Sequence, residues 1–116
     1  MELTLAHSPD ADDAFMFSAL ALGKLKTNGY RFTHVLRDIE TLNRAALEGV
    51  YDISAISFHA YPYVGENYLL LPCGASVGDG YGPLVVVRED FPEEKEPAVV
   101  AVPGKLTTAF LVMKLW

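Results

Sequence analysis

The sequence contains little cysteine and few basic residues. Its single cysteine, Cys73, cannot form a disulfide within the chain, which fits a reducing compartment. The chain has 9 lysines and arginines against 15 aspartates and glutamates, so its net charge is -6 and it repels a phosphate backbone. This composition argues against a nucleic-acid-binding protein.

Long apolar runs are also missing. No stretch approaches the roughly 20 apolar residues of a membrane-spanning helix, and residues 1–4 lack the basic start and apolar run of a signal peptide. We therefore expect a cytoplasmic protein without a membrane partner. Because no base can be identified beside Cys73, we expect its thiol to be a small buried side chain and not a nucleophile.

The chain does have enough apolar residues for a core, since 51% of its 116 residues are hydrophobic. Alternating apolar residues predict strands at residues 2–6, 30–37, 52–58, 68–71, 84–87 and 99–102. Capping residues and helical spacing predict helices at residues 12–22, from Asp38 to Gly49, near residues 61–63, and at 109–115. In the second of these helices the residues expected to face inward are Ile39, Leu42, Ala46 and Leu47. This alternation predicts an α/β fold with mainly parallel strand pairing.

A charged segment with two prolines, residues 91–97, is typical of an exposed crossing between two lobes. We therefore expect residues 1–90 to form a first α/β lobe and residues 98–116 to begin a truncated second lobe. A missing partner lobe would expose apolar side chains at residues 109–116, so we also expect the isolated chain to form homodimers or aggregates.

The first candidate site lies where the predicted strand 99–102 ends at Pro103-Gly104 and a helix begins. Free N–H groups at a helix start carry partial positive charge, so the hydroxyls of Thr107 and Thr108 beside them suit a carboxylate or phosphate. N-capping explains the same residues equally well. A nucleotide-hydrolysing motif is excluded, because Leu106 stands where that motif has Ser or Thr.

Further polar residues follow two of the other predicted strands. Ser8 and Asp12 come after the first strand, and Ser57 lies at the end of the third, so the three are expected at one edge of a parallel sheet. Asp10 or Asp12 can equally cap the following helix, a purely structural role.

The glycine-rich segment 74–83 is not a dinucleotide-binding loop, because it leads into a predicted strand and not into a helix. It is either a flexible turn or a backbone wall close to a ligand. In the second case Gly82 is a candidate substrate contact.

The three histidines are weaker candidates. His59 could act as a base near neutral pH, but no orienting carboxylate can be assigned to it, and a structural role is favoured. His34 lies in phase with the apolar residues of its strand, which favours packing, and His7 stays ambiguous. No two histidines have metal-ligand spacing, so we expect no zinc site.

Five segments stand out when they are taken together: His7-Ser8-Pro9-Asp10-Ala11-Asp12-Asp13-Ala14-Phe15, Asp38-Ile39-Glu40-Thr41-Leu42-Asn43, Ile56-Ser57-Phe58, Gly80-Tyr81-Gly82-Pro83 and Val102-Pro103-Gly104-Lys105-Leu106-Thr107-Thr108-Ala109. In this order they resemble the 1,4-dihydroxy-6-naphthoate synthase family of the futalosine route to menaquinone. The resemblance runs over the whole chain, which makes the set specific.

The resemblance implies a type II periplasmic-binding-protein-like fold, with two α/β lobes around a cleft, used in the cytoplasm. It implies a lyase that cleaves cyclic dehypoxanthine futalosine, an anionic small molecule, to 1,4-dihydroxy-6-naphthoate without a metal or organic cofactor. By position, Ala55, Ile56 and Ser57 on one lobe and Thr107 and Thr108 on the other resemble the family's substrate-binding residues.

Members of this family are much longer, and the histidine taken as their catalytic base lies in the part that would follow Trp116. We therefore expect a fragment or a remnant with little or no turnover of its own, and its catalytic residue stays unidentified. The alternative is a non-catalytic solute-binding protein or sensor for a small carboxylate. Both interpretations require the hydroxyls of Ser57 and Thr107 to face one ligand.

Overall fold

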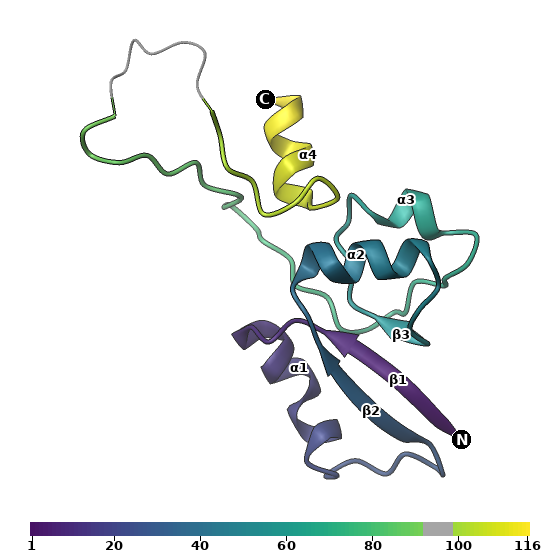
Figure 1. Ribbon diagram of the computed structural model, residues 1–116. Helices are drawn as coiled ribbons and strands as arrows, with labels where there is room; N and C mark the ends of the chain where they lie inside the picture. Colours follow the sequence, from purple (N-terminus) through teal and green to yellow (C-terminus); the bar gives the residue numbers. More distant parts are fainter. Residues whose placement is uncertain (92–98) are drawn as a thin grey trace.

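The computed structural model describes residues 1–91 and 99–116, and it contains one small sheet with helices beside it (Figure 1). In chain order the elements are β1 (Glu2–His7), α1 (Ala11–Ala21), β2 (Arg31–Leu36), α2 (Ile39–Leu47), β3 (Ile53–Ser54), α3 (Tyr61–Val64) and α4 (Thr108–Leu115). The predicted alternation of strands and helices is confirmed as far as α3.

The three strands form one parallel sheet in the order β2-β1-β3. β1 pairs with β2 along its whole length, from Glu2 opposite Arg31 to His7 opposite Leu36. α1 lies beside β2, and α2 lies against β1 (Figure 1). The predicted α/β class with parallel pairing is therefore confirmed.

Aspartates begin the two longer helices. The Asp10 carboxylate accepts a hydrogen bond from the Asp13 backbone N–H and caps α1. Asp38 accepts one from the backbone N–H of Thr41 at the start of α2. Each cap satisfies a backbone donor for which the helix itself has no acceptor. The capping interpretation thus applies to Asp10, whereas Asp12 lies within the first turn of α1.

The core lies between β1, α2 and α3. Its apolar members are Leu5, Ala6, Leu42, Ala46, Ala60 and Val64, each at most 2% exposed. Leu42 and Ala46 confirm the predicted inward stripe of α2, but Leu47 is exposed. Asn43 is fully buried in this core, where an amide is tolerated only if it forms hydrogen bonds.

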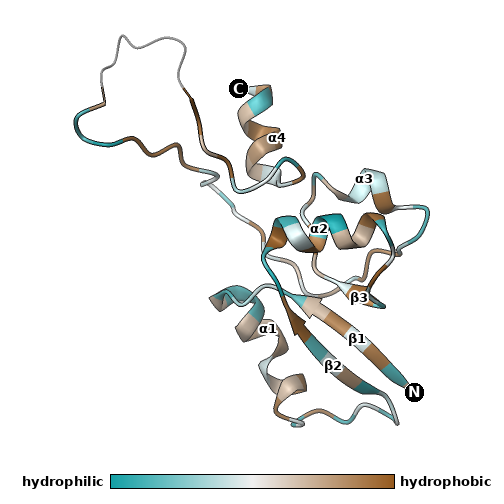
Figure 2. Cartoon of the chain, viewed as in Figure 1, coloured by the Kyte–Doolittle hydropathy of each residue, from teal (hydrophilic) through white to brown (hydrophobic). Residues whose placement is uncertain are grey.

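Three predicted strands are absent from the described residues: 68–71, 84–87 and 99–102. The strand expected over residues 52–58 is also reduced to Ile53–Ser54. A strand is held by hydrogen bonds to a neighbouring strand, and none of the three lies in the sheet formed by β2, β1 and β3. These apolar segments are exposed instead, with Val99 99% exposed where a buried strand was expected, as the brown stretches between α3 and α4 illustrate (Figure 2).

The structure is elongated. It measures 60 × 29 × 23 Å, with a radius of gyration of 17.1 Å, whereas a compact domain of this length has a radius of about 13 Å. Residues 84–91 extend away from the sheet (Figure 1). The crossing segment predicted at residues 91–97 lies, apart from Phe91, outside the described residues.

Cys73 is exposed, so the prediction of a buried thiol is wrong. The cysteine lies in the irregular chain after α3. None of the helices formed by residues 1–91 and 99–116 combines the length and the apolar character needed to cross a membrane.

Candidate functional site

One buried amide joins the two segments that the sequence singled out. Asn43 in α2 accepts a hydrogen bond at Oδ1 from the backbone N–H of Ser57, with an N–O distance of 2.8 Å. Its Nδ2 donates to the Ser57 hydroxyl at 3.0 Å and to the Leu106 carbonyl at 3.3 Å. Ser57 and the residue before Thr107 therefore both contact one amide nitrogen, although they lie far apart in the sequence.

Glu40 holds the same turn from three residues earlier on α2. Its Oε2 accepts a hydrogen bond from the Leu106 backbone N–H at 3.0 Å, and its Oε1 lies 2.9 Å from Nη2 of Arg44. Gly104 leaves room for this carboxylate, because a Cβ at that position would overlap the Glu40 side chain. Both backbone polar groups of Leu106 are thus bonded to side chains of α2.

Thr107 and Thr108 differ in what they leave for a ligand. The Thr107 hydroxyl donates to the Gly104 carbonyl at 2.7 Å and accepts from the Phe110 backbone N–H at 3.3 Å, and the residue is 3% exposed. Its hydroxyl therefore fulfils the N-cap interpretation. Thr108, the first residue of α4, is only partly buried, and the backbone N–H groups at this point of a helix have no acceptor in a preceding turn.

His59 packs beside the first turn of α4. Its Nδ1 lies 3.2 Å from the Thr107 carbonyl oxygen, and a carbonyl can only accept, so Nδ1 carries the proton. The His59 ring centroid is 6.0 Å from that of Tyr63 and 6.5 Å from that of Phe110. These contacts support the structural role that the sequence favoured for His59.

Ala55, Ile56 and Ser57 follow β3 directly. The Ala55 backbone N–H donates to the Ala6 carbonyl at 2.8 Å and continues the pairing with β1. The Ser57 carbonyl accepts from the Ala60 backbone N–H at 2.9 Å and turns the chain toward α3. The three residues therefore lie at the carboxyl edge of the sheet, next to Asn43.

The loop between β1 and α1 is held by its own hydrogen bonds. The Ser8 hydroxyl donates to Asp10 at 2.8 Å, and the Ser8 backbone N–H donates to Asp13 at 2.7 Å. The Ser8 hydroxyl is also the main cause that lowers the pKa of Asp10, whereas burial raises the pKa of Asp13 against the opposing bond from Ser8. Ser8 thus serves the loop itself, and the hydrogen bonds of the described residues do not connect it to Ser57.

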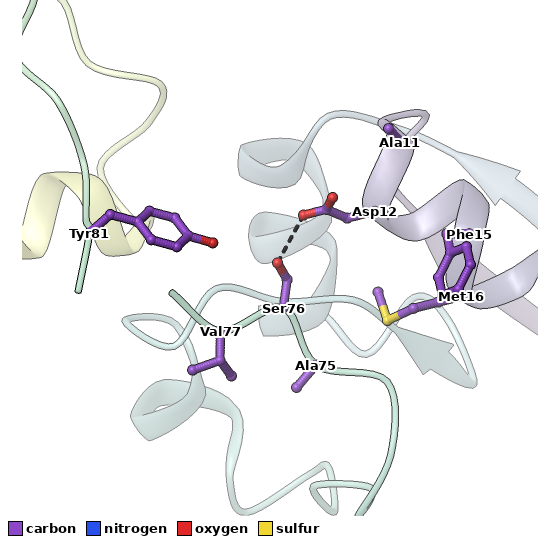
Figure 3. Close-up of a pocket in the computed structure, with 8 residues that line it drawn as sticks. All are labelled: Ala11, Asp12, Phe15, Met16, Ala75, Ser76, Val77 and Tyr81. Carbon is purple, nitrogen blue, oxygen red and sulfur yellow. Dashed lines mark hydrogen bonds between the residues drawn. The ribbon is translucent and has the colours of Figure 1, made fainter. Parts of the chain in front are cut away.

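Asp12 belongs to a different feature, an open pocket of about 410 Å³ between the start of α1 and the glycine-rich segment (Figure 3). The Ser76 hydroxyl donates to Asp12 Oδ2 at 2.8 Å and ties that segment to α1. The lining residues are Ala11, Asp12, Phe15, Met16, Ala75, Ser76, Val77 and Tyr81. Gly82 is exposed and is not among them. The Asp12 carboxylate therefore has its hydrogen-bond partner in the glycine-rich segment, and Gly82 as a substrate contact stays a prediction.

The structure also brings two histidines together, which the sequence did not predict. His7 Nε2 and His34 Nδ1 are 3.0 Å apart, and His7 Nδ1 is 3.0 Å from the Ser8 carbonyl oxygen. That carbonyl assigns the proton of neutral His7 to Nδ1, so His34 Nδ1 donates to His7 Nε2. The remaining His34 Nε2 is buried without a partner in the described part of the chain. Burial, and then the nearby His7, lower the pKa of His34.

The two histidines alone supply too few ligands for a zinc site. Residues 1–91 and 99–116 contain no group of three or more His, Cys, Asp or Glu side chains arranged to hold an ion. Structural zinc sites use four such ligands and catalytic sites use three.

Sequence reasoning missed Glu40 and Asn43 as site residues. The available signal was the helical periodicity of α2, in which Asn43 falls on the same face as Ile39, Leu42 and Ala46. A buried amide must find hydrogen-bond partners, so an Asn at an inward position marks a link to another segment. Which segment it contacts could not be read from the spacing.

Comparison with known proteins adds to this geometry. Residues 3–116 match the family described as Menaquinone biosynthesis. Over 114 residues, 98% of its length, the chain is 41% identical to the 1,4-dihydroxy-6-naphthoate synthase of Thermus thermophilus and 38% identical to that of Streptomyces coelicolor. These matches cover 41% and 40% of the two proteins, so the chain spans about two fifths of the length of these curated relatives.

A solved structure is also similar. The crystal structure of a protein from Archaeoglobus fulgidus matches with a TM-score of 0.67 and 53% sequence identity. The match covers 70% of this chain and 30% of that chain.

Proposed function

The chain belongs to the menaquinone biosynthesis family, and from this premise we propose that it forms part of a 1,4-dihydroxy-6-naphthoate synthase and carries one side of the substrate site. The proposed reaction is the lyase cleavage of cyclic dehypoxanthine futalosine that releases 1,4-dihydroxy-6-naphthoate. Two relatives with this name support the proposal. They give no support to the alternative of a non-catalytic solute-binding protein or sensor.

The observation that carries the proposal is the bond network of Asn43, which holds Ser57 beside the turn that begins α4. The Ser57 and Thr108 hydroxyls and the first N–H groups of α4 are hydrogen-bond donors, which suit a carboxylate or a sugar oxygen. Glu40 brings a negative charge near this point, but Arg44 and the Leu106 N–H compensate it. The group is therefore suited to an anionic ligand.

The expected affinity of these groups is low. Hydrogen bonds to a charged group contribute about 1.5–3 kcal/mol each, and millimolar binding corresponds to about 4 kcal/mol. Two such bonds reach at best the millimolar range once association costs are subtracted. We therefore expect weak binding of 1,4-dihydroxy-6-naphthoate by this chain.

An NMR titration with 1,4-dihydroxy-6-naphthoate tests the proposal, because it detects millimolar binding residue by residue. We expect the backbone amide signals of Ser57, Thr108 and Ala109 to shift, and Ser57→Ala and Thr108→Ala to weaken binding. Ser18→Ala, at an exposed serine on α1, is the matched control. Shifts confined to other regions, or equal binding by all variants, would contradict the proposed site.

Turnover is a separate question. We expect little or no release of 1,4-dihydroxy-6-naphthoate from cyclic dehypoxanthine futalosine by the purified chain, because no catalytic base is assigned within it. Robust turnover would show that a histidine of this chain serves as the base. In that case His59→Gln is the first variant to test, because His59 lies beside α4 and donates its Nδ1 proton to the Thr107 carbonyl.

For the whole protein we propose a type II periplasmic-binding-protein-like fold and a cytoplasmic location. The lobe assignment of residues 1–90 and 98–116 belongs to this proposal. The parallel order β2-β1-β3 with helices beside it supports the fold, and the free thiol of Cys73 fits a reducing compartment.

We also propose that the isolated chain associates into homodimers or larger species. Leu115 and Trp116 support this, because they are 78% and 93% exposed at the end of α4. Light scattering of the purified chain measures the species present, and a clean monomer would contradict the proposal.

A further inference from the structure

Asn43 is a fully buried amide whose polar atoms are all engaged. Its Oδ1 accepts from the Ser57 backbone N–H at 2.8 Å. Its Nδ2 has two protons, and it makes two bonds, to the Ser57 hydroxyl and to the Leu106 carbonyl. A fully satisfied amide of this kind has one orientation, because exchanging its oxygen and nitrogen would break this set of bonds.

This orientation determines the direction of the Ser57 hydroxyl proton. A serine hydroxyl has one proton to donate and two lone pairs that accept. Since Nδ2 of Asn43 is a donor, the Ser57 oxygen must accept there, and its proton cannot point at Asn43. The proton is therefore left for another acceptor, such as an oxygen of a bound ligand.

The same amide also holds the start of α4 near Ser57. Asn43 bonds the Leu106 carbonyl, and Glu40 accepts the Leu106 N–H at 3.0 Å. The turn before Thr107 is thus attached at both backbone groups of Leu106 to the helix that also holds Ser57. Two donor groups from distant parts of the sequence are kept at a constant spacing by one helix.

We propose that Asn43 is a positioning residue for the substrate site: it directs the Ser57 hydroxyl proton toward the ligand and holds the α4 start at the matching distance. This inference rests on the proposed function for the identity of the ligand. The ligand class is an oxygen acceptor, with the carboxylate of 1,4-dihydroxy-6-naphthoate as the probe. Asn43 acts through Ser57 and does not itself touch the ligand.

Asn43→Asp is the decisive variant because it keeps the shape of the side chain and the Oδ1 acceptor. The ionised carboxylate that it introduces has no N–H, so the Ser57 hydroxyl would donate to it and its proton would turn away from the ligand. We expect Ser57→Ala to weaken binding of 1,4-dihydroxy-6-naphthoate about tenfold, the loss of one charge-assisted hydrogen bond. Asn43→Asp should weaken it more than this, because it also removes the bond to the Leu106 carbonyl. Asn43→Asp should cost about tenfold less in the Ser57→Ala background than in the unmodified chain, because the bond from the Ser57 hydroxyl is already lost there.

Independent effects of Asn43→Asp and Ser57→Ala on binding would overturn the inference. If the effects of the two changes simply multiply, Asn43 does not act through the Ser57 hydroxyl. Unchanged binding by Asn43→Asp also overturns it. Asn67→Asp, at an exposed asparagine after α3, is the matched control for the added charge and should bind like the unmodified chain.

A measurement without ligand keeps the inference testable even if Asn43→Asp does not fold. In the unmodified chain both side-chain amide protons of Asn43 should exchange slowly with solvent, because both are hydrogen-bonded and buried. In Ser57→Ala one of them should exchange faster, while the other stays protected by Leu106. Rapid exchange of both protons in the unmodified chain would refute the assigned orientation.

The two proposals fail in different ways. Absence of any 1,4-dihydroxy-6-naphthoate binding by the unmodified chain contradicts the proposed function. Normal binding with multiplicative effects of the two variants contradicts only the role of Asn43.

Discussion

Acidification from pH 8 to pH 5 should destabilise this protein through its histidine pair. His34 donates its Nδ1 proton to His7, and its Nε2 is buried without a partner among the described residues. Protonation of His34 would place an N–H donor at a buried position that offers no acceptor, which is costly. Burial accordingly lowers the pKa of His34, and His7 adds to the effect.

The direction and size of the effect follow from proton linkage. The unfolded chain binds a proton at His34 near pH 6.5, whereas the folded chain binds it only at lower pH. Between these two values the unfolded state holds more protons, so stability falls as the pH falls. One proton accounts for at most about 1.4 kcal/mol per pH unit. Full stability from this site is therefore present above pH 6.5 and is lost progressively below it.

Urea unfolding followed by circular dichroism at pH 5, 6, 7 and 8 measures this slope. His34→Phe removes the titrating group and places an apolar ring in the apolar surroundings formed by Ala14, Phe17 and Leu36. The variant keeps Asp10 and Asp13, so the difference between the two slopes isolates the histidine. We expect a clearly flatter pH profile for His34→Phe.

An equal slope in both proteins would refute this reasoning. It would show that the pH dependence arises elsewhere in the chain. Asp13, whose pKa burial raises, has the opposite sign. Because the folded state keeps the Asp13 proton to a higher pH than the unfolded state does, stability from this group falls as the pH rises above 3.8, the ordinary pKa of an aspartate. Asp13 therefore cannot cause a loss of stability on acidification.

Three further changes test the packing and the turn that carry the site, all by urea unfolding. Leu42→Ala should cost about 2–5 kcal/mol, because the side chain is fully buried, whereas Leu47→Ala should cost less than about 1 kcal/mol because Leu47 is 41% exposed. Gly104→Ala should cost about 1–3 kcal/mol, since its Cβ would overlap Glu40, and an unchanged stability would show that this carboxylate moves freely. Asp10→Ala should cost about 1 kcal/mol through loss of the α1 cap, and no loss would show that water replaces it.

The local elements were largely predictable from the sequence. Alternation at Leu3 and Leu5 predicted β1, and the capping aspartates Asp10 and Asp38 marked the starts of α1 and α2 within one or two residues. These signals are local, because a strand period and a cap depend on residues a few positions apart. The apolar stripe of α2 was predictable for the same reason.

The strands of the second half could not be predicted correctly by the same argument. Residues 84–87 have the composition of a strand, yet Leu84 is 85% exposed and lies outside the sheet. Apolar β-branched residues have a high propensity for strands, but a strand forms only where another strand supplies hydrogen bonds. That partner is a property of the tertiary arrangement.

By itself, the sequence determined the α/β class, the helix starts, the inward face of α2 and the resemblance to one enzyme family. Only the tertiary structure decided that Asn43 joins Ser57 to Leu106, that His7 meets His34, and that Asp12 is bonded to Ser76. The physical reason is that periodicity and capping act within a few residues, whereas hydrogen bonds between distant segments depend on how the chain folds back on itself.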